Sequence, residues 1–494
     1  MQINSTGRRP EQPESRQSMN SALTQEVVDA LAPVSLRCVE CDALYPGGEM
    51  GQAPRYRCDC GGVLDVEMQP VLRKSPTPLL DEAGGVLSAV ESDLPPLAGA
   101  PWRQLFDERS GSLHTWSGTS EELLLDQSGV WRYRELILPI PARCIVSRPE
   151  GNTGLYPVGL ENCGSGPNRA GHRQIGSFAG LERLYLKHEG ENPTGSFKDR
   201  GMTVGISMAL AWGAAAVACA STGNTSASLA SYAAQAGMRC IVFLPVGNVA
   251  GGKLAQSLAY GATIIQIAGD FDDAMRLVEQ VCNEAGIYLL NSLNPFRIEG
   301  QKAIGFELLH QLDWQPPDWV VLPAGNLGNT SAIGKAFRQA YQLSLIGHMP
   351  RIASIQAAGA NPFYRSFTQK FAQRESVQAH TVATAIKIGN PVSYTRARRV
   401  IEESEGVVEE VTDEEILTAK AVIDRSGIGC EPASAATLAG MRKLVARGVI
   451  KHDERVVGIL TGNLLKDTVT GIPRGGGEVV VEPTIHAIRS VLSL

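Results

Sequence analysis

The chain has 494 residues, of which 43% are hydrophobic and 19% are charged, and its formal net charge at pH 7 is −6. This composition is typical of a soluble globular protein with more than one domain. The acidic balance argues against a nucleic-acid-binding surface, and no apolar run reaches the length of a membrane span. We therefore expect a cytoplasmic protein with neither nucleic-acid nor membrane partners.

The first segment, residues 1–34, is rich in Gln, Ser, Arg and Pro, and its N-terminal part lacks the apolar core of a secretory signal. It predicts a disordered tail with one short amphipathic piece at 24–31. Its Ser and Arg content leaves a transit peptide as a weaker alternative, which Glu11, Glu14 and Glu26 oppose.

Four cysteines lie close together within residues 35–66, as a Cys-x-x-Cys and a Cys-x-Cys motif. They are Cys38, Cys41, Cys58 and Cys60. Four thiolates on two tight turns suit a tetrahedral zinc ion with no open position, which predicts a structural zinc-ribbon-like module. A pair of disulfides is the alternative, and the lack of an export signal disfavours it. The other six cysteines stand singly, mostly in apolar surroundings, and are expected to be core residues.

Residues 67–145 are rich in Gly, Pro and Ser and are interpreted as an irregular extension that ends in a strand at 130–138. From residue 146 to 494, β-branched runs alternate with Ala-rich helical windows, which is typical of an open α/β sheet with helical crossovers. Strands are predicted at 216–220, 240–244, 263–267, 319–322, 351–356 and 455–460. Helices are predicted at 226–237, 253–261, 271–285, 298–312, 331–341, 413–426 and 432–447, and a loop at 371–380.

The most informative stretch is Asn-Pro-Thr-Gly-Ser-Phe-Lys, which places Lys198 at the start of a helix after turn-forming residues. A lysine in that position can serve as a fixed amine nucleophile for a carbonyl cofactor. The alternative is a solvated charge in the first helical turn. We expect Asp199 to face the helix start, where negative charge is favourable, and His188 to pack or hydrogen-bond rather than act as a base.

Three strand-to-helix junctions place small residues where backbone amides can approach a ligand at the carboxyl end of a strand. They are 221–225, 325–330 and 461–465. The second has neither the spacing nor the lysine of a nucleotide-binding loop and suits a single phosphate group. An ordinary glycine-rich turn is the alternative for any one of these junctions.

The three junctions together with Lys198 predict pyridoxal phosphate (PLP), attached to this lysine as a Schiff base. The freed amine could then move protons at the substrate's α and β carbons. Asn224 can donate to the ring hydroxyl oxygen. Thr461 is a neutral hydroxyl that would face the ring nitrogen, where it would weaken the electron sink of the ring.

These motifs resemble threonine synthase, a PLP enzyme of fold type II. Besides the lysine stretch, the matching segments are 150–153, 221–225, 253–262, 291–302, 325–329, 383–391 and 429–436. The likeness covers residues from about 146 to the end, and some family members also carry an upstream cysteine ribbon. It implies a catalytic domain at 146–494, built of two open α/β subdomains with the cofactor between them.

The resemblance implies a phosphorylated amino acid as substrate, with conversion of O-phospho-L-homoserine and water to L-threonine and phosphate. It assigns the cofactor phosphate to the loop Gly325, Asn326, Leu327, Gly328 and Asn329. It assigns substrate binding to Ser221, Thr222, Thr225, Lys253, Asn291, Ser292, Arg297 and Asn326. A dianionic phosphate needs fixed cations and amides, and an arginine offers it a planar fork.

Some of these residues have simpler explanations. Lys253 could be a surface charge, and Arg297 could form a solvated pair with Glu299 or Glu307. The first motif also departs from the family, because Pro149 and Gly154 stand where many members have glycine and proline.

Two other functions remain open at this point. One is another fold-type II enzyme, such as a threonine ammonia-lyase or a β-replacement synthase, which would not need Lys253 and Arg297 for a second phosphate. The other is a catalytically silent protein whose ribbon recruits a partner, which the intact Lys198 opposes. The sequence leaves the oligomeric state open, and a homodimer is one candidate.

Overall fold

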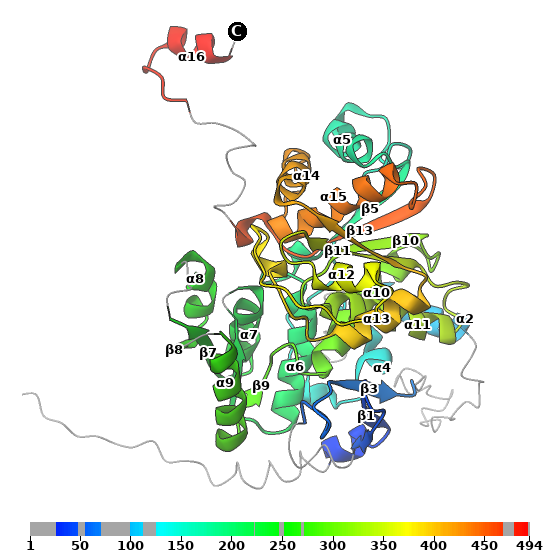
Figure 1. Cartoon of the computed structure of the whole chain (residues 1–494), viewed down its shortest axis with the longest axis vertical. Helices are drawn as coiled ribbons and strands as arrows, with labels where there is room; N and C mark the ends of the chain where they lie inside the picture. The colour runs from blue at the N-terminus through cyan, green and yellow to red at the C-terminus, as the bar shows by residue number, and fades with distance from the viewer. Residues whose placement is uncertain are drawn as a thin grey trace, which may run out of the picture.

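The computed structural model describes residues 26–47, 55–70, 99–111, 125–221, 223–246, 251–267, 271–467 and 479–492. These residues form sheets of three, six and four strands. In Figure 1 the four-stranded sheet with its helices lies beside the six-stranded sheet, and the N-terminal sheet, in blue, lies beneath them. In the described part of the chain, no helix is both long enough and apolar enough to cross a membrane.

The N-terminal sheet is antiparallel and has the strand order β2-β1-β3. Its strands are β1 (Val34–Cys38), β2 (Leu44–Pro46) and β3 (Leu64–Met68). Alternate residues of β1 are buried, so that one face of the strand packs against the protein. Just before β1, a helical turn buries Val27 and Leu31. The rest of the predicted tail, residues 1–25, lies outside the described residues.

The prediction of a strand at 130–138 is wrong. Two helical turns occupy this segment, η3 (Trp131–Tyr133) and α4 (Arg134–Ile137), and η4 (Ala142–Cys144) follows them. The hydroxyl of Ser128 accepts hydrogen bonds from the backbone N–H groups of Val130 and Trp131, both at 3.1 Å, which favours a turn over an extended chain. The large apolar residues of segment 130–138 therefore reflect its burial and do not indicate an extended strand.

The six-stranded sheet has the order β12-β11-β10-β13-β5-β4 and is parallel except for β4. Its strands are β4 (Leu155–Pro157), β5 (Arg183–His188), β10 (Trp319–Pro323), β11 (Arg351–Ala357), β12 (Val407–Val411) and β13 (Arg455–Leu460). All five residues of β10 are buried, as expected for a parallel strand with helices on both faces.

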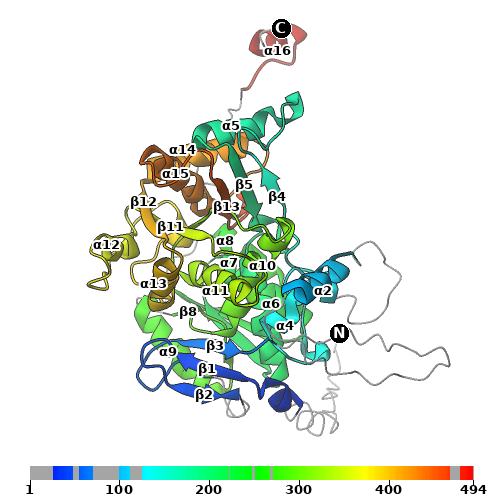
Figure 2. The same ribbon diagram turned by 90° about the vertical axis from the view of Figure 1, so that its right-hand side faces the viewer.

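Helices cover both faces of this sheet (Figure 2). On one face lie α5 (Ala170–Ala179), α14 (Asp413–Arg425) and α15 (Pro432–Ala446). On the other face lie α10 (Phe296–Gln311), α11 (Gly328–Gln342) and α13 (Tyr394–Glu403). The short α12 (Pro362–Thr368) and η7 (Thr384–Ile386) lie in the connection between β11 and α13. Trp319 and Val321 of β10 pack toward the first group, whereas Val320 and Leu322 pack toward the second.

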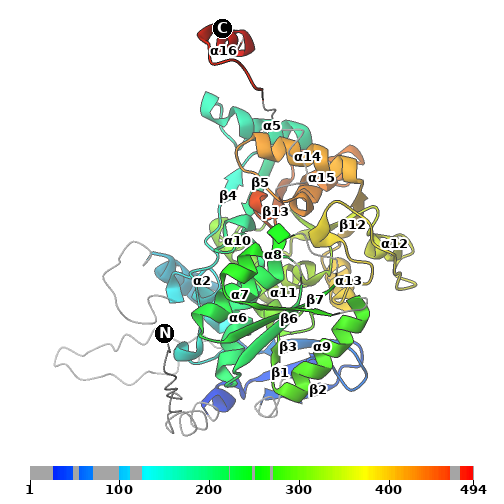
Figure 3. The ribbon, with the colours of Figure 1, turned by 90° about the vertical axis from the view of Figure 1, so that its left-hand side faces the viewer.

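The four-stranded sheet is parallel and has the order β8-β7-β6-β9. Its strands are β6 (Ala216–Ala220), β7 (Arg239–Pro245), β8 (Thr263–Ile267) and β9 (Tyr288–Leu289). Its helices are α6 (Lys198–Ala211), α7 (Asn224–Gln235), α8 (Gly251–Ala259) and α9 (Phe271–Ala285). Figure 3 shows α9 and α7 on opposite faces of the sheet. Helix α6 contacts both α7 and α10 and so joins the two sheet units.

The six predicted strands and seven predicted helices of the second half are all present, with small shifts at their ends. The loop at 371–380 contains neither helix nor strand, as predicted. Strands β5 and β12 were not predicted, because charged residues interrupt their apolar runs. The last helix, α16 (Ile485–Leu492), stands apart from the rest of the protein (Figure 1).

Candidate active site

Lys198 is the first residue of α6, and backbone hydrogen bonds fix the loop before it. The N–H of Phe197 donates to the carbonyl of Thr461 at 3.0 Å, and the N–H of Asn463 donates to the carbonyl of Gly195 at 2.9 Å. The loop of the predicted nucleophile is therefore joined to the end of β13. The Lys198 Nζ atom lies 4.0 Å from the centre of the Phe197 ring.

Asp199 and His188 stabilise the same loop. The buried Asp199 carboxylate accepts hydrogen bonds from the Thr194 N–H at 2.7 Å, the Thr194 hydroxyl at 2.6 Å and the Ser228 hydroxyl at 2.5 Å. The Nδ1 atom of His188 accepts from the N–H of Gly190 at 3.2 Å. The predicted position of Asp199 at the helix start and the predicted hydrogen bond of His188 are both present.

The environment of Lys198 favours its neutral amine. Burial, reinforced by the guanidinium of Arg297, lowers the pKa of Lys198 to about 7, and the carboxylate of Glu431 only partly opposes this shift. An ordinary lysine is almost fully protonated at neutral pH and is a poor nucleophile. Lys198 therefore presents a large fraction of neutral amine at that pH.

The two predicted ring contacts, Asn224 and Thr461, meet at the carboxylate of Glu431. The Asn224 amide donates to one oxygen of Glu431 at 3.0 Å, and the Thr461 hydroxyl donates to the other at 3.3 Å. Ser434 completes the group, with its hydroxyl oxygen 3.0 Å from that of Thr461. Burial raises the pKa of Glu431, although the Asn224 bond and the nearby Lys198 charge oppose this rise. The structure thus brings Asn224 and Thr461 together near the predicted nucleophile.

Sequence reasoning gave no role to Glu431 or to Lys466. Glu431 lies in segment 429–436, which matches the family, so the sequence did mark this region. The hydrogen-bond partners of Glu431 could not be read from the sequence. The Lys466 ammonium donates to the Gln256 side chain of α8 at 2.6 Å, which joins the segment after β13 to the four-stranded unit. Burial lowers the pKa of Lys466, whereas the Asp199 and Glu431 carboxylates raise it, which places this lysine near the candidate site.

The predicted phosphate loop joins β10 to α11. Leu327 has a positive φ of 64° and immediately precedes α11, which begins at Gly328 and directs the free amides of its first turn outward. A Cβ atom on Gly325 would lie 2.9 Å from the Cα of Ile386, so a larger residue would force the chain apart there. The side chain of Asn329 is 5% exposed, and neither its nitrogen nor its oxygen has a hydrogen-bond partner among the described residues. A buried, unpartnered amide at a helix start indicates a binding site for a polar ligand.

The segment after β9 carries the predicted contacts to a second anion. The Asn291 side-chain oxygen accepts from the N–H of Ala220 at 2.9 Å, at the end of β6. The Ser292 hydroxyl accepts from the Asn326 side chain of the phosphate loop at 3.2 Å. Asn291 and Ser292 therefore lie between the ligand-facing ends of the two sheets.

Arg297 is a buried cation for which no acidic partner is found among the described residues. Its side chain is 3% exposed and donates a hydrogen bond to the carbonyl of Leu290 at 3.2 Å, and its Nε atom has no partner within the described part of the chain. The alternative explanation, a solvated pair with Glu299 or Glu307, is not found, because both carboxylates contact other cations. Burial lowers the pKa of Arg297 to about 10. A desolvated guanidinium in this position indicates a site for an anion.

The remaining predicted substrate residues are only partly described. Ser221 follows β6, and its hydroxyl accepts from the N–H of Gly223 at 3.3 Å. Thr225 lies in the first turn of α7. Thr222 lies outside the described residues, as does the side chain of Lys253, whose backbone belongs to α8.

The structure explains why Gly154 stands where many family members have proline in the first motif. The N–H of Gly154 donates to the carboxylate of Glu191 at 2.6 Å, and a proline has no N–H to donate. The hydroxyl of Tyr156 donates to the same carboxylate. A Cβ atom on Gly154 would lie 2.6 Å from the Tyr156 ring, so the glycine and the tyrosine form one arrangement.

These groups fit PLP. Lys198 offers a neutral amine for its aldehyde, and Asn224 and Thr461 suit the polar atoms of its ring. The start of α11 suits its phosphate, together with Asn329, whose side chain has no partner among the described residues. The separately buried Arg297 remains for another anion.

The four predicted metal ligands also come together. The sulfur atoms of Cys38, Cys41, Cys58 and Cys60 all lie within 4.8 Å of one another, and the Cys38–Cys60 and Cys41–Cys58 distances are both 3.5 Å. Tetrahedral zinc with Zn–S bonds of about 2.3 Å separates its sulfurs by about 3.8 Å. All ten cysteines are free thiols, and the six outside this cluster are buried, as predicted. The geometry fits zinc, and the alternative pair of disulfides is not formed.

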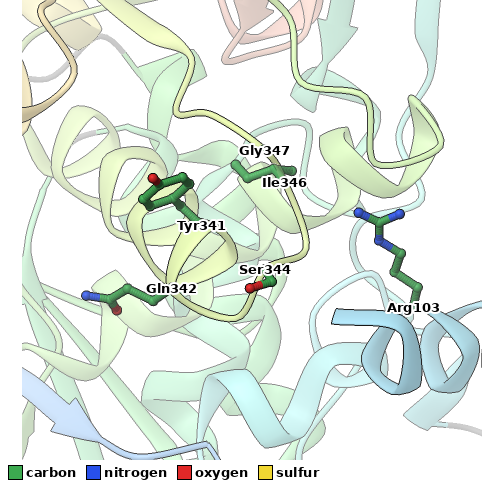
Figure 4. A pocket seen from close by; sticks show the side chains of 6 residues that line it. All are labelled: Arg103, Tyr341, Gln342, Ser344, Ile346 and Gly347. Carbon is green, nitrogen blue, oxygen red and sulfur yellow. The ribbon is translucent and has the colours of Figure 1, made fainter. Parts of the chain in front are cut away.

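A surface hollow of about 710 Å³ lies elsewhere, between α2 (Gly99–Gly111) and the residues around the end of α11 (Figure 4). It is lined by Arg103, Tyr341, Gln342, Ser344, Ile346 and Gly347. None of the predicted catalytic or binding residues lines it.

Comparisons with known proteins agree with this geometry. Residues 172–462 match the family described as "Pyridoxal-phosphate dependent enzyme". Threonine synthase of Methanosarcina acetivorans is 50% identical over 92% of this chain and 98% of its own length. Threonine synthase of Methanocaldococcus jannaschii is 41% identical over the same shares of the two chains.

Two solved structures support the fold. The processed form of threonine deaminase isoform 2 from Solanum lycopersicum has a TM-score of 0.54 at 20% identity, covering 70% of this chain and 85% of that one. Maize serine racemase has a TM-score of 0.52 at 21% identity, covering 63% and 88%. The predicted fold type II is confirmed, and the chain belongs to the pyridoxal-phosphate-dependent enzymes and, within them, to the threonine synthases.

Proposed function

We propose that the protein converts O-phospho-L-homoserine and water to L-threonine and phosphate, with Lys198 as the lysine that carries PLP. The observation that carries this proposal is the buried Arg297, which has no acidic partner among the described residues and lowers the pKa of Lys198. A second anion site so close to the nucleophile suits a substrate that brings its own phosphate.

PLP, when bound, supplies an aldehyde for imine formation and a ring that withdraws electrons from the substrate. The protein's own residues bind this cofactor and fix its orientation. The amides at the start of α11 and the Asn329 side chain bind the cofactor phosphate, and the Asn224 amide and Thr461 hydroxyl orient the ring. The neutral amine of Lys198 accepts and returns protons at the reacting carbons of the substrate.

Arg297, Asn291 and Ser292 bind the substrate phosphate in this proposal. The phosphate is a dianion that leaves the substrate, so a fixed cation stabilises the charge that develops on it. Asn326 contacts Ser292 from the cofactor loop, which supports a role for it in contacting both phosphate groups. Lys253 and the segment 221–225 complete the substrate site.

The rate at which the cofactor-free protein captures PLP should rise with pH. Because the pKa of Lys198 is lowered to about 7, its reactive neutral form dominates only above that pH. We expect the capture rate, followed by absorbance, to have a midpoint near pH 7 and to level off above it. In the Arg297→Ala protein the midpoint should move to higher pH, because a positive neighbour has been removed. A midpoint near the ordinary lysine pKa in the unaltered protein would contradict the assignment.

Replacement of Arg297 by alanine should mainly weaken binding of the phosphorylated substrate. We expect KM to rise by about tenfold or more, which corresponds to the loss of about 1.4 kcal/mol or more of binding free energy. Arg297→Lys should recover part of the affinity, because it restores the charge without the planar fork. Arg338→Ala is the matched control, since Arg338 pairs with Glu403 at the surface. An unchanged KM in Arg297→Ala would remove this residue from the substrate site.

The function itself is tested by measuring phosphate release from O-phospho-L-homoserine and threonine formation in parallel. Equal amounts of both products, with inorganic phosphate as a competitive inhibitor, are the expected result. Ammonia release from threonine or serine without inhibition by phosphate would instead support an ammonia-lyase.

We also propose that the cysteine ribbon is a structural zinc module upstream of a catalytic part that spans residues 146–494. The sulfur distances support a closed four-thiolate site, which leaves no ligand position for substrate. Metal analysis of the purified protein should give one zinc per chain.

A further inference from the structure

The cysteine ribbon, here the described residues 34–47 and 55–68, contacts the helices of the six-stranded unit. The side chain of Arg399 in α13 donates to the carbonyl of Val39 at 2.6 Å. The Lys335 ammonium of α11 donates to the Asp65 carboxylate at 3.0 Å. The ribbon is therefore attached to two helices of this unit through its own backbone and side chains.

The same ribbon also contacts the four-stranded unit. The hydroxyl of Tyr56 accepts a hydrogen bond from the N–H of Leu289 in β9 at 2.8 Å. The Tyr56 ring packs edge-on against Tyr288, with 6.0 Å between the ring centres. A module that contacts both units can fix the position of residues 290–295, the segment that joins β9 to α10.

Two valines of the ribbon form a small apolar cluster with that segment. Val39 and Val63 are buried together with Leu293, and Tyr56 and Val392 pack against them. Val39 lies between the two cysteines of the first motif, and Val63 lies three residues after the last cysteine. The N–H of Val39 donates to the carbonyl of Val63 at 3.0 Å, so the two cysteine turns present these side chains jointly.

The partners of these valines lie next to the proposed anion contacts. Leu293 follows Ser292 directly in the chain. The N–H of Val392 donates to the side-chain oxygen of Asn326 at 3.3 Å, and the Asn326 nitrogen donates to Ser292 at 3.2 Å. The valine cluster therefore supports the Ser292–Asn326 pair from both sides.

We infer that the metal-bound ribbon positions the substrate-phosphate site, with Val39 and Val63 as positioning residues that act through Leu293 and Val392. This inference rests on the proposed role of Ser292 and Asn326. A bound metal ion would join the two cysteine turns, because the four sulfurs that would hold it come from both turns. Without the ion, the two turns would be joined only by backbone hydrogen bonds such as that between Val39 and Val63, and the valines would pack less firmly against Leu293. Displacement of a binding group by about 1 Å can reduce rates by up to about 100-fold.

The test uses the full-length enzyme loaded with PLP, before and after removal of zinc with a thiol-reactive mercurial and a chelator. The mercurial is then displaced with excess thiol, and zinc is restored to one portion. Four quantities are measured: zinc content, bound cofactor by absorbance, KM and kcat for O-phospho-L-homoserine, and the dissociation constant of inorganic phosphate by calorimetry. We expect KM and the phosphate constant to rise together by about tenfold, with kcat and bound cofactor changing much less. Restored zinc should reverse the effect.

Three variants separate positioning from folding. Cys60→Ser removes one metal ligand and should behave as the zinc-free enzyme. Val63→Ala keeps all four ligands and should raise the same two constants while its zinc content stays normal. Cys163→Ser is the control, because Cys163 is a buried thiol outside the ribbon.

The outcomes distinguish this inference from the proposed function. Unchanged KM and phosphate affinity in the zinc-free enzyme, or in Val63→Ala, would overturn the positioning role. If the zinc-free enzyme unfolds, Val63→Ala still decides the question. If the unaltered enzyme releases no phosphate from O-phospho-L-homoserine, the proposed function fails. The dissociation constant of inorganic phosphate, measured with and without zinc, then still tests whether the ribbon positions the phosphate site.

Discussion

Replacement of Lys198 by alanine is expected to abolish turnover and covalent attachment of PLP while the fold is retained. The side chain supplies the neutral amine, because burial and the neighbouring Arg297 lower its pKa to about 7. Loss of a covalent nucleophile that also moves protons typically costs about 10⁴-fold or more in kcat. Borohydride reduction followed by peptide mapping should place the cofactor on Lys198 in the unaltered enzyme and on no lysine in the variant.

The loss should be specific to this lysine. Lys451→Ala is a suitable control, because Lys451 is exposed and has no ion pair among the described residues. Circular dichroism of Lys198→Ala should match that of the unaltered enzyme, since the loop before α6 is fixed by backbone bonds to Thr461 and Asn463. A mapped cofactor on Lys466, the other lysine near Asp199 and Glu431, would move the nucleophile and overturn the assignment.

The sequence was sufficient for the elements with regular patterns. Strands such as β8 and helices such as α9 have ends that coincide with the predicted ones, because their apolar periodicity is clear and turn residues bound them. The segment at 130–138 was misread because burial alone produces an apolar run, and only the Ser128 hydrogen bonds select a helical turn.

Site residues could be predicted from the sequence where their motif consists of a few consecutive residues. Lys198 and the loop at 325–329 could be found from short strings, since the start of a helix and a glycine-rich turn are encoded within a few residues. Glu431 and Lys466 could not be assigned in that way, because their partners Asn224 and Gln256 lie some 200 positions away in the chain. That Arg297 has no carboxylate partner among the residues that the structure describes is likewise a property of the folded protein.

The buried ion cluster beneath the site was equally beyond local patterns. The Glu307 carboxylate contacts the Lys187 ammonium at 2.6 Å and the Arg200 guanidinium at 2.8 Å, and Arg200 contacts Glu189 at 2.6 Å. These residues come from β5, η6 (Glu189–Glu191), α6 and α10, and their side chains are at most 2% exposed. The Glu307 carboxylate also accepts from the N–H of Asn152 at 2.8 Å, so the cluster holds the first motif against α6.

Glu307→Ala should therefore be among the most destabilising single changes in the chain. It removes a buried anion shared by Lys187 and Arg200 and leaves both cations undercompensated, so we expect the free energy of unfolding to fall by about 3–5 kcal/mol. Despite its burial, the cations keep the pKa of Glu307 well below its ordinary value. The contribution is therefore complete above a pH of about 4.3 and is lost as the pH falls below it.

Denaturant unfolding of Glu307→Ala and of Glu403→Ala provides the measurement and its control. Glu403 forms a half-exposed pair with Arg338, so its removal should cost less than about 1 kcal/mol. The double variant Lys187→Met/Glu307→Ala should recover part of the loss, because one of the undercompensated cations is gone. Equal destabilisation by Glu307→Ala and Glu403→Ala would mean that the buried charges contribute no more than a surface pair, and the cluster could then not be what holds Asn152 and α6 together.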